Sequence, residues 1–207
     1  MNGRRAEAAQ NDSRILDAAR EVFIADPGAP ISAVAARAGV GIAALYRRYD
    51  NKEDLLRELA HDACKRYRDD LLLALADAGD PWTVYCDCLT RIVAGRSQGL
   101  AQRLAGTFAS TPEMRALAQD AAGLMEKLHQ RAQKQKVLRA DVSSADLVIL
   151  LEMIMLIDVV GSPAKDALRT RYLALVLQSL RAPGAGPLPG RPASPDDLTA
   201  RWRAQQP

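Results

Sequence analysis

The chain has 207 residues, of which 48% are hydrophobic and 4% aromatic, a balance that excludes a disordered chain and favours a helical core of aliphatic side chains. The formal net charge of +3 does not indicate a nucleic-acid partner by itself. Three cysteines without metal-ligand spacing favour a reducing cytosol, so we expect a cytoplasmic protein. The most apolar stretch, 147–157, is too short to span a bilayer, so we expect no membrane partner.

The N-terminal region predicts a polar tail followed by one amphipathic helix. Residues 1–12 are polar, and Asp12 or Ser13 can cap a helix that begins near Ser13. Pro27 and Pro30 then mark a loop. The apolar residues of the predicted helix share one face and are Ile15, Leu16, Ala19, Val22 and Phe23.

Residues 31–52 predict two short helices joined by a tight turn. Ile31, Val34, Ala35 and Ala38 follow the i, i+3, i+4, i+7 spacing of a buried helix face. Gly39 comes next, where a residue without Cβ can take the left-handed conformation that ends a helix. The second helix, about 42–49, is expected to bury Leu45 and Tyr49.

The opposite side of this second helix suits insertion into a DNA major groove. Small residues at its start let the backbone approach base edges, and Arg47 and Arg48 can bind phosphates or guanine. Tyr46 offers a hydroxyl donor, and Lys52 follows Asn51, which is expected to cap the start of the next helix. The candidate DNA-binding residues are Ser32, Arg37, Gly41, Ile42, Ala43, Ala44, Tyr46, Arg47, Arg48 and Lys52.

The stretch from Arg14 to Leu59 resembles the N-terminal helix-turn-helix domain of TetR-family transcriptional regulators. Two positions depart from the family pattern, which usually has Ser or Thr at Gly41 and often Thr at Ala44. Two hydroxyl contacts are therefore missing, although glycine is a tolerated N-cap. The matching segments, in order, are Ile-Leu-Asp-Ala-Ala (15–19), Val-Phe (22–23), Val-Ala-Ala-Arg-Ala-Gly-Val (34–40), Leu-Tyr-Arg-Arg-Tyr (45–49) and Asn-Lys-Glu-Asp-Leu-Leu (51–56).

The remainder of the chain predicts further helices and no strand alternation. We therefore expect an all-α fold, with a helix-turn-helix domain over 12–58, a helical ligand-binding and dimerisation domain over 59–182, and a proline-rich strap with a short docking helix over 183–207. Ser194 and Pro195 mark the start of that last helix, in which Leu198 and Trp202 share a face. The other predicted helices span 53–76, 82–95, 98–109, 113–137, 144–160 and 165–181.

The apolar stretch 145–160 predicts a helix that is buried on all sides. With the following helix it can form half of a four-helix interface across a two-fold axis. The resemblance implies the same, because TetR-like proteins dimerise through their last two long helices. The candidate interface residues are Leu147, Leu151, Ile154, Leu168, Tyr172, Leu175 and Val176.

The resemblance also implies that the central helices enclose a pocket for a small-molecule effector. Met and aromatic candidates for its lining can equally be ordinary core. Glu152 is a carboxylate in an apolar helix, and either a ligand or an arginine across the interface can be its partner. The candidate ligand-binding residues are Trp82, Tyr85, Phe108, Met125, His129, Glu152 and Met153.

An enzymatic alternative rests on two Glu-x-x-His pairs, Glu58 with His61 and Glu126 with His129. Two such pairs build a di-iron site in ferritin-like bundles. The first pair, however, lies where the long helix leaves the DNA-binding domain. We therefore favour a homodimeric TetR-like repressor that binds a palindromic operator and is released by an unknown effector. No catalytic residue, metal site or cofactor is predicted.

Overall fold

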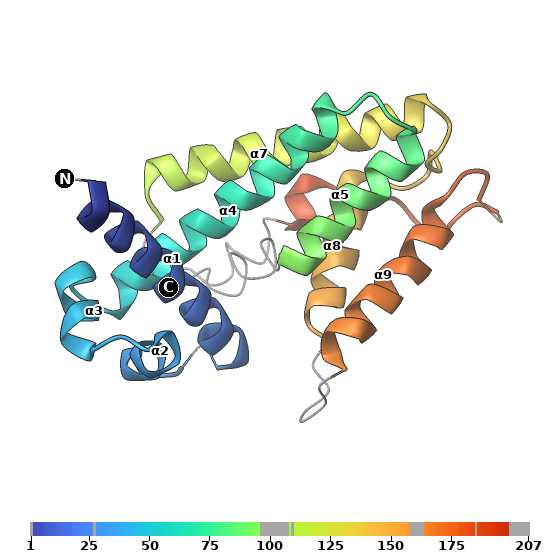
Figure 1. The fold of residues 1–207 in the computed structure, drawn as a ribbon. Coiled ribbons are helices and arrows are strands. Elements are labelled where there is room, and N and C mark those ends of the chain that lie inside the picture. The colour runs from blue at the N-terminus through green and yellow to red at the C-terminus, as the bar shows by residue number, and fades with distance from the viewer. Residues whose placement is uncertain are drawn as a thin grey trace. The chain divides into compact units, whose positions relative to one another are not determined.

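The computed structural model describes residues 2–26, 28–95, 108, 110–157, 164–184 and 186–198. Within these ranges the regular elements are helices, and the only strand-like pairing is an isolated bridge between Leu138 and Arg181. The all-α prediction is therefore confirmed. The described residues form two compact units, divided within helix α4 between Asp62 and Ala63 (Figure 1).

The first unit contains α1 (Asn2–Ala25), α2 (Ile31–Ala38), α3 (Ile42–Arg48) and the start of α4 (Lys52–Ala76). Its core combines the apolar faces of all four helices. The helix predicted to begin near Ser13 begins at Asn2 instead. The reason is that residues 4–10 consist of Ala, Arg, Glu and Gln, which are strong helix formers. The buried residues are Ile15, Ala18, Ala19, Phe23, Ala29, Ile31, Val34, Ala35, Ala38, Leu45, Tyr49, Leu55, Leu56, Leu59 and Ala60.

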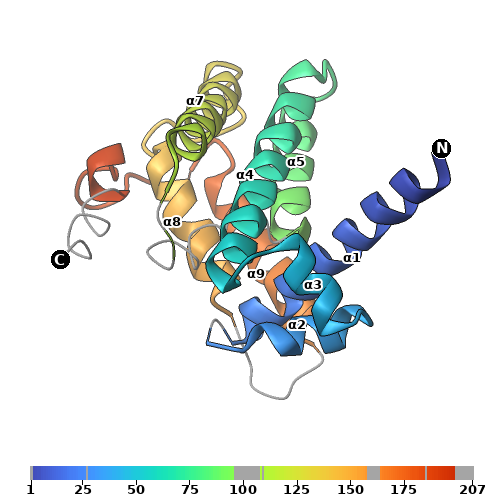
Figure 2. The ribbon, with the colours of Figure 1, turned by 90° about the vertical axis from the view of Figure 1, so that its left-hand side faces the viewer.

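The second unit contains the rest of α4 with α5 (Pro81–Gly95), α7 (Pro112–Lys134), α8 (Ser144–Met155) and α9 (Lys165–Leu180). Helix α5 contacts both α7 and α9, and α8 contacts α7 and α9 (Figures 1 and 2). The shared core is largely aliphatic, as the composition predicts. Its largest fully buried side chains are Leu71, Tyr85, Leu89, Ile92, Met125 and Leu128.

Two predicted helices end earlier than expected. Helix α7 stops at Lys134 rather than 137, because Gln135 caps it and Lys136 takes a left-handed φ of 57°. Helix α8 stops at Met155 rather than 160, where the N–H of Ile157 turns back to the Ile154 carbonyl. The predicted helix over 98–109 lies outside the described residues except for Phe108, and so does Trp202.

Residues 181–198, here called the strap, are fastened to the α7–α8 junction, residues 135–146. Polar contacts from the junction hold the strap along much of its described length. The expected helix start at Ser194 is confirmed, since residues 195–198 are helical and the Asp197 N–H donates to the Ser194 hydroxyl. The contacts are Ala182 N–H to Val137 O at 3.0 Å, Arg139 Nη2 to Gly186 O at 2.7 Å, Leu188 N–H to Asp141 Oδ2 at 3.1 Å and Ser143 Oγ to Ala193 O at 2.7 Å.

Candidate nucleic-acid interface

The turn between α2 and α3 is built as the sequence predicts. Gly39 has a φ of 65°, and the Val40 N–H returns to the Ala35 carbonyl at 3.1 Å, which ends α2 in a common C-terminal pattern. Arg14 adds a contact that the spacing did not reveal, since its Nη2 donates to the Ala38 carbonyl at 2.8 Å. This hydrogen bond links α1 to the end of α2, immediately before the turn.

Helix α3 is anchored on one side and presented to solvent on the other. Leu45 is fully buried and Tyr49 is 3% exposed, as predicted, so the helix is held by two side chains about one turn apart. On the opposite side Ile42 is 41% exposed and Tyr46 50% exposed. Ala43, Arg47 and Arg48 are also exposed and Ala44 is half-buried.

The starts of the neighbouring helices complete this surface. Gly41 takes the N-cap position of α3 with an extended backbone, so the helix forms without a capping side chain. Asn51 caps α4, because its Oδ1 accepts from the Asp54 N–H at 2.9 Å. Lys52 is half-buried, with Nζ 5.1 Å from the centre of the Phe23 ring. Ser32 is exposed in the first turn of α2.

The arginines of this surface differ in their surroundings. Arg37 forms an ion pair with Glu21 of α1. Arg48 pairs with Asp12, Nε to Oδ1 at 3.3 Å, and its guanidinium lies 5.1 Å from the centre of the Tyr49 ring. Arg47 is exposed and makes no ion pair with any other described side chain. The surface is therefore cationic, but two of its guanidinium groups already contact carboxylates.

Comparison with known proteins identifies the family that has this arrangement of helices. The family model of the bacterial regulatory proteins of the tetR family matches residues 15–59, and the model of the SbtR-like transcriptional regulator C-terminal domain matches residues 77–182. The chain belongs to the TetR family. TetR-family proteins are DNA-binding transcriptional regulators and not enzymes, so the predicted class of function is confirmed.

Solved TetR regulators share the fold. One from Streptomyces coelicolor is 26% identical, with a TM-score of 0.59 over 82% of this chain and 97% of that one. One from Mycobacterium vanbaalenii is 27% identical, with a TM-score of 0.57 over 86% and 99%. A TetR-like regulator from Mycobacterium smegmatis, solved in complex with proflavine, is 23% identical, with a TM-score of 0.55 over 86% and 99%. No curated protein gives a significant match.

The predicted effector-binding residues of this TetR protein are not all brought together. Tyr85, Met125 and His129 are buried in the core of the second unit, and the Trp82 ring lies 6.2 Å from the Tyr85 ring. Glu152 is half-buried and Met153 is 61% exposed on α8. Phe108, also half-buried, belongs to the first unit. The candidates therefore divide into a buried group around His129 and residues that lie elsewhere.

His129 has both ring nitrogens engaged. Its Nε2 lies 2.9 Å from the Val142 carbonyl, which can only accept, so Nε2 carries the proton. Its Nδ1 then accepts from the Tyr85 hydroxyl at 3.0 Å. Burial lowers the pKa of His129, which favours this neutral form.

This bonding argues against the di-metal alternative. A metal would need a nitrogen lone pair, but the lone pair of Nδ1 accepts from the Tyr85 hydroxyl, and Nε2 carries the proton that it donates to the Val142 carbonyl. Glu58 and His61 belong to the other unit, and in the part of the chain that the structure describes no three metal-ligating side chains gather. The enzymatic alternative is therefore not supported.

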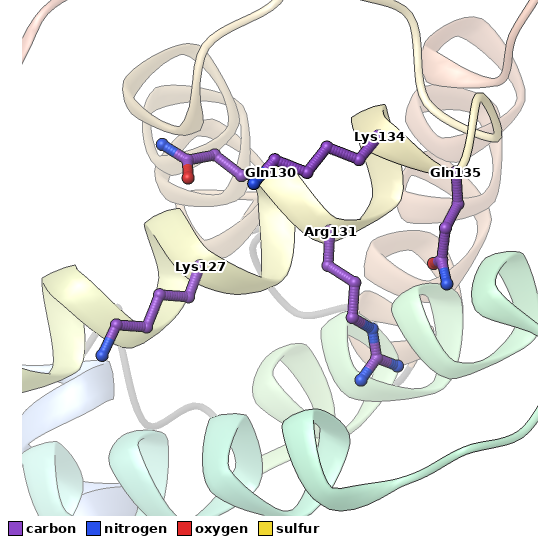
Figure 3. A pocket seen from close by; sticks show the side chains of 5 residues that line it. All are labelled: Lys127, Gln130, Arg131, Lys134 and Gln135. Carbon is purple, nitrogen blue, oxygen red and sulfur yellow. The ribbon is translucent and has the colours of Figure 1, made fainter.

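An open hollow of about 400 Å³, lined by long cationic and amide side chains, lies on α7 (Figure 3). Arg131 crosses it and donates to the carbonyls of Leu75 and Asp77, each at 3.0 Å, at the C-terminal end of α4. None of the predicted effector-binding residues lines it, and its cationic and amide side chains differ from the apolar lining expected of an effector pocket. The lining residues are Lys127, Gln130, Arg131, Lys134 and Gln135.

The predicted dimer-interface residues also fall into different groups, some buried in their own chain and others exposed. Leu147, Leu151 and Ile154 are buried in the core of their own chain, at 0%, 1% and 4% exposure, so a partner cannot reach them. Leu168 and Val176 are half-buried. Tyr172 and Leu175 are 48% and 50% exposed on α9. Met153 of α8 and Leu156, which directly follows α8, are also exposed. An apolar stretch that only Asp146, Glu152 and Asp158 interrupt does not show which of its faces points inward.

No helix among the described residues combines the length and hydropathy needed to cross a lipid bilayer.

Proposed function

We propose that this TetR-family regulator is a cytoplasmic repressor that binds a palindromic operator as a homodimer and is released by a small-molecule effector. The presentation of α3 carries the proposal. Leu45 and Tyr49 fix the helix, while Ile42 and Tyr46 project from its opposite side. A recognition helix held in this way can enter the major groove with its first turns against the base edges.

Within this proposal the exposed residues have different roles. Ile42 and Ala43 stand in the first turn of α3, where apolar contact with base edges gives sequence preference. Tyr46, Arg47 and Lys52 offer donors to phosphates, which position the protein but do not read sequence. Ala44, half-buried and without a hydroxyl, contributes at most a methyl contact. Ser32 at the start of α2 offers a hydroxyl to the backbone of the same groove.

The exposed apolar side chains of α8 and α9 support a dimer. Met153, Leu156, Tyr172 and Leu175 are each between 48% and 63% exposed, so covering them with a partner would remove apolar surface from water. A two-fold axis through this face would cover them with their own counterparts. Two recognition helices per dimer then require an operator with two inverted half-sites.

Effector release is proposed to act through α4. This helix starts beside the DNA-binding surface and continues into the core of the second unit, where Tyr67, Leu71 and Ala74 are buried. A small molecule can release DNA only if it binds the non-DNA conformation more tightly. A regulator of this fold binds proflavine, which supports a small-molecule effector as the class of ligand.

Enrichment from a random duplex DNA library at moderate salt tests the proposal. We expect an inverted repeat with half-sites about one helical turn apart or slightly more. Lys52→Ala should weaken binding to all sequences about equally and lower the salt dependence, whereas Ile42→Ala should change the enriched sequence. If a folded, dimeric protein enriches no sequence, specific DNA binding is excluded. The recovered duplex then serves as the probe for effector screening.

A further inference from the structure

Two arginines of the DNA-binding surface are paired with carboxylates of α1. Arg48 Nε lies 3.3 Å from both Oδ atoms of Asp12, and Arg37 Nε donates to Glu21 Oε2 at 2.5 Å. The partners are 36 and 16 residues apart in sequence, so the contacts follow from the packing of α1 and not from helical spacing. Two independent pairs therefore connect the same helix to the same cationic surface.

Both pairs are open to solvent. The Arg48 and Asp12 side chains are 49% and 37% exposed, and those of Arg37 and Glu21 are 60% and 51% exposed. Exposed ion pairs are weak and screened by salt, so another anion can take either guanidinium. A DNA phosphate is such an anion, because Arg binds phosphate and carboxylate with the same planar donor geometry.

We propose that Asp12 and Glu21 compete with DNA phosphates for Arg48 and Arg37, so that α1 limits the affinity of the protein for duplex DNA of any sequence. This inference rests on the proposed DNA-binding surface. Each arginine has to leave its carboxylate before it can neutralise a phosphate, and the carboxylate that stays nearby repels the DNA backbone. Arg47, which has no such partner among the described side chains, binds phosphate without this competition.

Another pair on α1 provides a matched control. Asp17 is 55% exposed and pairs with Arg20 at 2.7 Å, but the Arg20 side chain is only 11% exposed and also contacts Asp62 at 2.8 Å. Asp17→Asn changes the net charge by the same amount as Asp12→Asn and on the same helix. It releases no exposed arginine on the DNA-binding surface.

The experiment measures affinity for a random-sequence duplex as a function of salt concentration. We expect Asp12→Asn and Glu21→Gln each to raise the affinity about three- to tenfold near 0.1 M salt and to steepen the slope of log K against log salt by up to about 0.9, the value of one phosphate contact. Asp17→Asn should raise the affinity less and leave the slope unchanged. A larger effect of Asp12→Asn and Glu21→Gln than of Asp17→Asn on affinity and slope is the evidence for competition.

A double-mutant cycle separates competition from a general change in charge. In the Arg48→Gln background, Asp12→Asn should raise the affinity no more than Asp17→Asn does, because a charge is removed but no guanidinium is released. If the full gain persists there, or if Asp17→Asn gives an equal gain, the competition is refuted while DNA binding stands. If the wild-type chain binds no duplex at all, both the proposed function and this inference fail.

Discussion

The helix-turn-helix and the α7–α8 junction are stabilised by different kinds of contact. In the first, Ile31, Val34 and Leu45 bury the faces that the helical period assigns to them. In the second, polar side chains hold irregular backbone: Gln133 Nε2 donates to the Val142 carbonyl at 2.8 Å, and Asp146 Oδ1 accepts from the Ala193 N–H at 2.8 Å. Helical periodicity thus determines the structure of the helix-turn-helix, whereas contacts between residues distant in sequence determine the structure of the junction.

The difference matters because irregular backbone must find partners for its own polar groups. A helix satisfies them internally, so its side chains need only pack. The junction turns several times over residues 135–146 and cannot do so. Most of the strap lies beyond residue 182, where the match to the C-terminal domain model ends. The junction and the strap therefore supply partners to each other's polar groups.

The largest expected effect is at Asp146, which occupies the third position of α8. Its carboxylate accepts from the Ser143 N–H at 2.8 Å and from the Ala193 N–H at 2.8 Å. Asp146→Ala leaves both donors without this partner, and we expect a loss of about 2–3 kcal/mol in the free energy of unfolding. Chemical denaturation measures it.

Asp54 is a matched control, because it occupies the corresponding position of α4 after the cap Asn51. Among the described side chains its carboxylate pairs only with Arg57 of the same helix, Nη1 to Oδ1 at 2.7 Å. Asp54→Ala should therefore cost less than about 1 kcal/mol. Equal losses at the two positions would contradict the contrast between local and distant contacts.

Periodicity and turn chemistry were enough to predict the helix-turn-helix. The buried face of α2, the left-handed Gly39 and the buried pair Leu45 and Tyr49 are all as expected, since each depends on residues within a few positions. The resemblance to TetR regulators added the class of function. The start of α1 was predicted too late, although the helix formers in residues 4–10 were a usable signal.

Contacts between distant residues could not be predicted from spacing. Arg14 and Ala38 are 24 residues apart, Arg48 and Asp12 are 36 apart, and the strap contacts span about 50. For the same reason, spacing could not show which of the predicted dimer-interface residues are buried in their own chain. The pattern over 145–160 showed an apolar helix, but only the tertiary packing shows that Leu147 faces the core and that Met153 is exposed.

His129 gives a smaller effect that depends on pH. Burial lowers its pKa in the folded state, so below about pH 6.5 the unfolded chain takes up the proton more readily than the folded chain does. The free energy of unfolding should therefore fall as pH drops from 7.5 to 5.5. Denaturation at several pH values measures the slope. His129→Gln should remove this component, whereas His61→Gln should retain it; a slope unaffected by His129→Gln would exclude His129 as its source.

The smallest effect is expected at Tyr49, whose polar hydroxyl group is buried in the otherwise apolar core of the helix-turn-helix. The Tyr49 hydroxyl is buried without a hydrogen-bond partner among the described residues, and burial raises the pKa of Tyr49 to about 12. Tyr49→Phe should leave the free energy of unfolding unchanged or raise it by up to about 1 kcal/mol, because it removes an unpaired polar group. DNA affinity should not change, since this hydroxyl is not at the surface.

Tyr46→Phe is the matched variant, with Tyr46 50% exposed one turn earlier in α3, and it should lower DNA affinity without changing stability. A loss of stability in Tyr49→Phe would show that the hydroxyl has a partner in solution, and the core of this region would then depend on a polar contact as the junction does.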